Sequence, residues 1–196
     1  MPEITLLTGQ IQSGKTSLCL EVVKAARQAG FQLGGLISPG VFEAGMKTGI
    51  DILDISSGER RRLADRLESG SAAISTRRWS FLPEAVAWGN EILAGAVPCD
   101  LLIIDELGPL EFLRGEGWLE GFHAVRSHEY QAALLVIRPS LLQEALDRWE
   151  AARIVNLDDP AELLRSGSKM LDSMIGYSQK KSVFTSSLNG IIEEQI

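Results

Sequence analysis

Hydrophobic positions along the chain fall into two alternating kinds of segment. Short continuous apolar runs are typical of strands that are buried on both faces of a sheet. Segments with apolar residues three and four positions apart are typical of helices that pack one face against a core. The predicted strands are 4–7, 33–37, 101–104, 132–137 and 154–157. The predicted helices are 15–29, 83–93, 118–126 and 140–152.

Strands and helices alternate through most of the chain, which predicts an α/β fold with a mainly parallel sheet flanked by helices. One stretch departs from this pattern. Apolar and polar residues alternate over 49–55 and end at the turn Ser56-Ser57-Gly58. Together with the stretch around Val41-Phe42, this alternation predicts a small antiparallel excursion around 41–55.

The ends of the later elements are predicted from polar residues. Ser140 is a suitable N-cap for the helix over 140–152, and Asp159-Pro160 predicts the start of a further helix. We expect one domain over residues 1–166. Residues 167–196 are richer in Ser and Lys, and we expect a C-terminal helix or tail there.

A phosphate-loop motif lies between the first predicted strand and the first predicted helix. Residues 9–16 (GQIQSGKT) match the pattern G-x-x-x-x-G-K-[ST]. Its two glycines allow a tight turn whose backbone N–H groups point into one concavity. The following helix directs its positive end to the same place. The predicted nucleotide-binding residues are Gly9, Gln10, Ile11, Gln12, Ser13, Gly14, Lys15, Thr16 and Ser17.

Two residues of this loop have more specific predicted roles. Lys15 is expected to reach the β- and γ-phosphates and to take part in catalysis, and the Thr16 hydroxyl to ligate Mg²⁺. A glycine turn before a helix that starts with lysine is the structural alternative.

Two acidic residues follow the apolar run 101–104. In phosphate-loop proteins, an acid at the end of a buried strand holds Mg²⁺, so Asp105 is the second predicted metal ligand. Glu106 comes next and is the predicted catalytic residue, because a carboxylate there can orient or deprotonate the attacking water. The alternative is a strand that simply ends at the surface.

These motifs resemble the small P-loop nucleoside-triphosphatases described from thermophilic bacteria and, in humans, as the cancer-related nucleoside-triphosphatase. The resemblance continues through residues 35–64 and through 104–111 (IDELGPLE). Two positions depart from the family pattern, with Gln12 in place of Gly and Pro109 in place of Lys. The resemblance implies a P-loop NTPase fold and slow, Mg²⁺-dependent hydrolysis of ATP, GTP and other nucleoside triphosphates to diphosphates.

Further candidates for contact with the ligand are basic or polar. Lys47 occupies a basic position of the family pattern, Arg138 follows a predicted strand, and Asn156 lies in the last strand, where a base contact is expected. The arginines at 60–62 and 77–78 suit either phosphate contact or a solvated helix face and loop, and we favour the second interpretation.

Composition limits the class of ligand. The chain has 196 residues, 45% of them hydrophobic and 23% charged, and its formal net charge is −7. This acidic balance is unfavourable for binding nucleic acid or an anionic membrane, but it is compatible with a small metal-bound nucleotide.

The N-terminus has no signal-peptide pattern, and the longest apolar run, 132–137, is too short to span a bilayer. We therefore expect a cytoplasmic location.

Three functions fit these observations. The first is Mg²⁺-dependent hydrolysis of nucleoside triphosphates. The second is a small P-loop kinase that acts on a metabolite. The third is a nucleotide-dependent switch or adaptor with little turnover of its own. For each we expect a monomer, with a protein partner left open.

Overall fold

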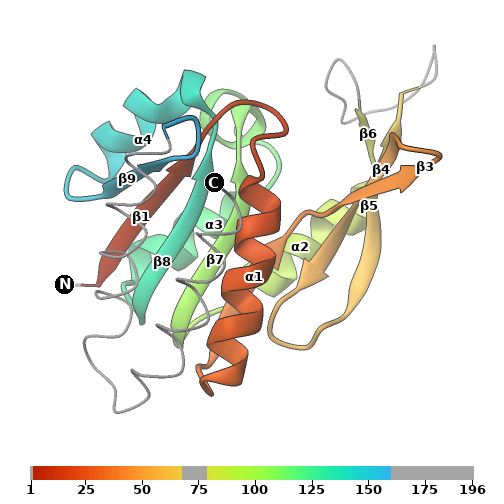
Figure 1. The fold of residues 1–196 in the computed structure, drawn as a ribbon. Coiled ribbons are helices and arrows are strands. Elements are labelled where there is room, and N and C mark those ends of the chain that lie inside the picture. Colours follow the sequence, from red (N-terminus) through yellow and green to blue (C-terminus); the bar gives the residue numbers. More distant parts are fainter. Residues whose placement is uncertain (1, 68–78, 160–196) are drawn as a thin grey trace.

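The computed structural model describes residues 2–67 and 79–159, and Figure 1 shows their arrangement. In these ranges nine strands form one sheet, in the order β6-β5-β4-β2-β7-β8-β1-β9, with β3 paired to β4. The strands are β1 (Glu3–Thr8), β2 (Leu33–Ile37), β3 (Gly40–Glu43), β4 (Met46–Asp54), β5 (Arg60–Arg66), β6 (Trp79–Phe81), β7 (Cys99–Leu107), β8 (Tyr130–Ile137) and β9 (Arg153–Asn156). The neighbours β2, β7, β8, β1 and β9 are parallel, which confirms the predicted α/β fold.

Helices cover both faces of the parallel part (Figure 1). They are α1 (Lys15–Gln28), α2 (Pro83–Ala94), α3 (Leu119–Ser127) and α4 (Leu142–Arg148), with a π-helical turn at Leu110–Arg114. One hydrophobic cluster joins α1 to one face of the sheet, and a second joins α2, α3 and α4 to the other. No helix of the described part is long and apolar enough to cross a membrane.

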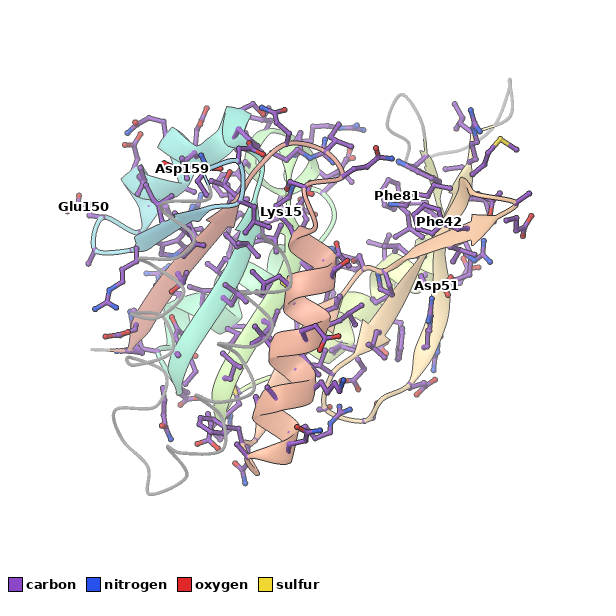
Figure 2. All side chains as sticks on the ribbon, in the orientation of Figure 1. Lys15, Phe42, Asp51, Phe81, Glu150 and Asp159 are labelled. Carbon is purple, nitrogen blue, oxygen red and sulfur yellow. The ribbon has the colours of Figure 1, made fainter. Side chains whose placement is uncertain are left out.

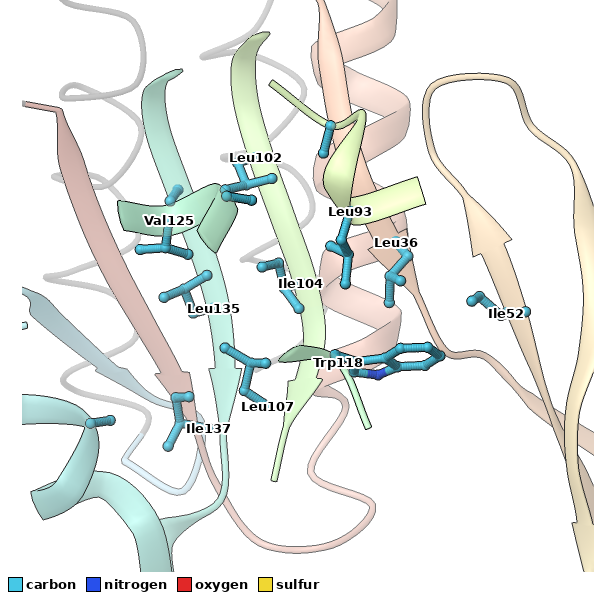
Figure 3. Close-up of a cluster of buried hydrophobic side chains, with 14 of the residues drawn as sticks. Leu36, Ile52, Leu93, Leu102, Ile104, Leu107, Trp118, Val125, Leu135 and Ile137 are labelled. Atoms are coloured by element: carbon cyan, nitrogen blue, oxygen red, sulfur yellow. The ribbon is translucent and has the colours of Figure 1, made fainter. Parts of the chain in front are cut away.

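The continuous apolar runs follow from burial on both faces. In β7, Leu101 and Ile103 pack in the α1 cluster, whereas Leu102 and Ile104 pack in the other cluster. Figure 3 shows this second cluster, where Trp118 lies near Leu36 and Leu107. Since side chains of a strand alternate between faces, each position must be apolar.

The antiparallel excursion is confirmed, and it is longer than predicted. It comprises β3, β4, β5 and β6, and it extends away from the parallel core (Figure 1). Arg60–Arg66 is a strand, so the helix-or-loop interpretation of residues 60–62 is wrong. Charged side chains are tolerated there because one face of an antiparallel strand can face water. Arg60 and Arg62 both pair with Asp51, at 2.7 and 2.9 Å.

The helix predicted for 140–152 is shorter than expected. Residues Pro139–Leu141 form a 3₁₀ turn, and α4 spans only Leu142–Arg148. Ser140 is therefore inside this turn and is not the N-cap, because Pro139 favours an earlier turn. The predictions for Arg77-Arg78, for the helix from Pro160 and for 167–196 lie outside the described residues.

Candidate active site

The candidate residues follow the carboxyl ends of neighbouring parallel strands. The phosphate loop follows β1, the acidic pair lies at the end of β7, Arg138 follows β8, and Asn156 ends β9. Because parallel strands place their carboxyl ends at one edge, the topology gathers these residues there. Parallel sheets bind ligands at this edge.

The phosphate loop has the backbone that its glycines predict. Gly9 and Gly14 have φ of 148° and 92°, values that favour glycine. Gln12 also lies in the left-handed region, at φ 68°. This is the position where the family pattern has glycine, so here a bulkier residue adopts the glycine conformation. Ser13 N–H donates to the Gln10 carbonyl at 3.1 Å and closes the turn.

Lys15 is the first residue of α1 and lies at the amino end of that helix (Figure 2). Its ammonium group donates to the carbonyls of Gly9 (2.6 Å) and Gln10 (2.7 Å) and to Ser13 Oγ (3.3 Å). Burial lowers the pKa of Lys15, and the carboxylates of Glu106 and Asp105 oppose this. The lysine thus lies within electrostatic reach of the acidic end of β7.

The end of β7 is irregular where the two acids occur. Ile104 pairs with Leu135 of β8, but the next paired residue, Leu107, is matched to Ile137. One extra residue in β7 makes a bulge, and bulges re-aim side chains near active sites. Asp105 and Glu106 lie in this bulge and leave the ladder of the sheet.

Asp105 is 3% exposed, so it is a buried acid. Burial, together with the nearby charge of Glu106, raises its pKa from 3.8 to about 6. Hydrogen bonds from Ser38 N–H (3.3 Å) and from the Thr16 hydroxyl oppose this rise, as does the charge of Lys15. The two predicted metal ligands, Thr16 and Asp105, therefore lie close enough for the hydroxyl to favour the ionised acid.

This donor set fits Mg²⁺. A hydroxyl and a carboxylate are the hard oxygen ligands that Mg²⁺ prefers, and Mg²⁺ in phosphate sites takes only one or two carboxylates from the protein. Across residues 2–67 and 79–159, no group of three or more His, Cys, Asp or Glu could form a full protein cage. Ser38 Oγ is buried and has no hydrogen-bond partner among the described residues. The backbone N–H of the same residue donates to Asp105, so Ser38 lies beside the acid.

Glu106 differs from its neighbour in exposure. Its side chain is 28% exposed and forms an ion pair with Arg138 Nε, whose side chain is 46% exposed. The structure therefore brings Arg138, a predicted ligand contact, to the predicted catalytic carboxylate. This pair leaves Glu106 open to solvent while one of its oxygens is held by a cation.

Lys47 belongs to β4 of the antiparallel excursion and interacts electrostatically with the site. Its ammonium nitrogen lies 5.2 Å from the centroid of the Trp79 ring, a cation–π distance. Burial lowers the pKa of Lys47, opposed by the charges of Asp105 and Glu106. Lys47 is therefore within electrostatic range of both acids, although it comes from a different part of the sheet.

Asn156 is linked to the phosphate loop through Asp158. Its side-chain oxygen accepts a hydrogen bond from Asp158 N–H at 3.0 Å. The Asp158 carboxylate accepts the Gln10 N–H, at 2.9 and 3.1 Å. Sequence reasoning missed Asp158. In the sequence, Asp158 is an acid just after the last predicted strand. Its place beside the phosphate loop follows only once β9 is known to pair with β1.

Ser38 and Glu111 were also missed as site residues. Ser38 follows β2, and only the sheet order places β2 beside β7. Glu111 is buried and accepts hydrogen bonds from Gly108 N–H (2.7 Å) and Trp118 N–H (2.8 Å). Burial raises its pKa, and these amides oppose the rise. In the sequence, Glu111 is the last residue of the stretch 104–111 that resembles the family pattern.

A mainly parallel sheet with a phosphate-loop sequence between β1 and α1 defines the P-loop class of α/β proteins. The family model described as NTPase matches residues 4–150, which is more than half of the chain. The chain belongs to this NTPase family.

Relatives named nucleoside-triphosphatase THEP1 support this assignment. The THEP1 of Methanothermobacter thermautotrophicus is 32% identical over 177 residues, which cover 88% of this chain and 96% of that relative. The THEP1 of Methanopyrus kandleri is 32% identical over 112 residues, 57% of this chain. The chain spans 61% of the length of that relative, and 58% of the THEP1 of Ignicoccus hospitalis, which is 33% identical over 105 residues.

Two solved structures share the fold. The solution structure of a human cancer-related nucleoside triphosphatase superposes with a TM-score of 0.60 at 20% identity, covering 84% of this chain and 98% of that chain. The crystal structure of THEP1 from Aquifex aeolicus gives a TM-score of 0.59 at 18% identity, covering 83% and 95%.

Proposed function

We propose that the chain hydrolyses nucleoside 5′-triphosphates, ATP and GTP among them, to nucleoside diphosphate and phosphate in a Mg²⁺-dependent reaction. The observation that carries the proposal is the placement of Glu106. It is a partly exposed carboxylate beside the buried Asp105, at the edge where the phosphate loop lies. The nucleoside-triphosphatase names of the THEP1 relatives support the same class of reaction.

In this proposal the loop residues 9–17 hold the phosphates. Their backbone N–H groups and the positive end of α1 attract the anion without a basic surface. Lys15 exchanges its contacts with loop carbonyls for the β- and γ-phosphates. This local arrangement explains how a chain of net charge −7 accommodates a triphosphate.

Thr16 and Asp105 would hold Mg²⁺, consistent with the effect of the Thr16 hydroxyl on the pKa of Asp105. When bound, Mg²⁺ neutralises charge on the β- and γ-phosphates. Asp105 is available as a ligand in its ionised form, and Lys15 favours that form.

Glu106 orients the attacking water and takes its proton. The water oxygen forms a bond to the γ-phosphorus, and the bond to the β–γ bridging oxygen breaks, which releases the diphosphate. Arg138 and Lys47 are proposed to face the γ-phosphate, where positive charge stabilises the transition state. Asn156 is proposed to lie toward the base of the nucleotide. We also propose that the protein is monomeric and cytoplasmic.

Phosphate release from a panel of nucleoside triphosphates tests this proposal. With Mg²⁺ and without any acceptor, we expect release from several triphosphates, and we expect EDTA to abolish it. A kinase would release little phosphate until an acceptor was added. A switch would bind nucleotide with negligible release until a partner was added. Either pattern would contradict hydrolysis as the function.

A further inference from the structure

Glu111 is a buried acid that the proposed mechanism does not use. Within residues 2–67 and 79–159, only Asp105 and Glu111 are acids classed as buried, and Glu111 is 7% exposed. A buried carboxylate is costly unless hydrogen bonds compensate it. Its place in the fold therefore calls for an explanation beyond packing.

Both oxygens of Glu111 hold backbone amides at the two ends of one segment. Oε2 accepts Gly108 N–H at 2.7 Å, and Oε1 accepts Trp118 N–H at 2.8 Å. Hydrogen bonds to an ionised acceptor are stronger than those between neutral groups. The carboxylate thus closes the segment 108–118, which follows β7, into a fixed loop.

Two glycines let the backbone come close to this carboxylate. A Cβ at Gly117, which has φ of 77°, would lie 1.9 Å from Glu111 Oε1. A Cβ at Gly108 would lie 3.3 Å from Glu106 Oε1, 3.7 Å from Glu111 Oε2 and 4.0 Å from Arg138 Nε. Gly108 is therefore the point where the Glu111 loop meets the Glu106–Arg138 ion pair.

We propose that Glu111 is a positioning residue for Glu106. By holding the Gly108 amide, it fixes the backbone two residues after Glu106, so that Glu106 keeps its pair with Arg138 and its direction toward the water. This inference rests on the proposed function, in which Glu106 activates water. Glu111 then affects turnover only through the position of Glu106.

The substitution Glu111→Gln tests the proposal. The amide keeps the size of the side chain, but its NH₂ group is a donor and replaces one of the two acceptor oxygens. One of the two hydrogen bonds from backbone N–H groups is therefore lost. We expect kcat to fall by about tenfold or more, because misplacement of a catalytic group reduces the rate. The Kd for ATP, measured by equilibrium titration, should stay within about twofold, because the hydrogen bonds of Glu111 go to Gly108 and Trp118 and not to the phosphate loop.

Asn90 provides a matched control. Its side chain donates to the Gly117 carbonyl (2.7 Å) and accepts Glu120 N–H (3.0 Å), so it anchors the exit of the same loop but does not contact Gly108. We expect Asn90→Ala to lower the melting temperature while kcat stays within about twofold of wild type. If Asn90→Ala reduces kcat as much as Glu111→Gln does, the role of Glu111 is general stability, and the proposal fails.

A double variant separates this proposal from the proposed function. In the Glu106→Gln background, Glu111→Gln should cause no further loss, because residues that act as a unit are not additive. Additive losses, or wild-type kcat in Glu111→Gln, would overturn the positioning role. If wild type releases no phosphate, or Glu106→Gln is fully active, the proposed function itself fails.

Gly108→Ala serves if Glu111→Gln does not fold. It leaves the Glu111 carboxylate in place and adds a methyl group 3.3 Å from Glu106 Oε1. We expect a severalfold loss of kcat with an unchanged Kd for ATP. Wild-type kcat in this variant would contradict the link between Gly108 and Glu106.

Discussion

The phosphate loop and the end of β7 meet at one edge of the sheet but are built differently. The loop is largely local, since Lys15 bonds to carbonyls five and six residues away. The end of β7 depends on distant partners, because Asp105 is 67 residues from Ser38 and Glu106 is 32 residues from Arg138. Local contacts therefore shape the proposed anion site, whereas distant contacts hold Asp105 and Glu106.

The largest expected effect is at the end of β7, where Asp105 depends on distant partners. Asp105→Asn should reduce phosphate release by about 100-fold or more, because a proposed metal ligand is lost. It should also stabilise the protein without Mg²⁺. A pKa raised from 3.8 to about 6 corresponds to about 3 kcal/mol of destabilisation by the ionised group.

The sign of the pH dependence follows from this raised pKa. The contribution of Asp105 to stability is fully present below its unfolded pKa and is lost as pH rises through about 6. In urea unfolding with EDTA, Asp105→Asn should gain up to about 3 kcal/mol at about pH 8 and almost nothing at about pH 4. An equal gain at both values would show that burial of charge is not the cause.

Asp158 is the exception to the local character of the loop, since it holds Gln10 N–H from 148 residues away. Asp158→Asn keeps an acceptor oxygen for this amide but removes a negative charge that acts on Lys15. We expect the Kd for ATP to fall about two- to fivefold, an effect that salt reduces because the group is exposed.

Asp158→Ala is the matched control, because it removes the charge and the hydrogen bond together. Titration at low and high salt compares the three proteins. If Asp158→Asn weakens binding as much as Asp158→Ala does, charge is not the property that matters, and the loop depends on this contact for its shape.

The smallest expected effect concerns the local strain of the loop. Gln12 has φ of 68°, which costs a non-glycine residue roughly 1–2 kcal/mol. Gln12→Gly should relieve this cost, but glycine increases the entropy of the unfolded chain. Thermal unfolding should therefore show a net gain of at most about 1 kcal/mol. A clear loss of stability would mean that Gln12 makes contacts that outweigh the strain.

The sequence predicted what repeats along the chain and missed what depends on sheet order. Runs such as 101–104 predicted the buried strands, and 9–16 predicted turns at Gly9 and Gly14 but not the positive φ of Gln12. The strand Arg60–Arg66 was missed because its charged side chains pair across an exposed antiparallel face. Ser38 and Asp158 needed the orders β2-β7 and β1-β9, which periodicity does not reveal. Glu111 was missed because its burial and its bonds to the amides of Gly108 and Trp118 appear only in the folded chain.

In the proposed mechanism Glu106 activates water and does not bind the nucleotide. The direct measurement compares Glu106→Gln with wild type in Mg²⁺-dependent phosphate release and in equilibrium binding of ATP. We expect turnover to fall by about 100-fold or more, the range for a general base, while the Kd changes by less than about threefold. Wild-type turnover in Glu106→Gln, or a loss explained entirely by weaker binding, would contradict it.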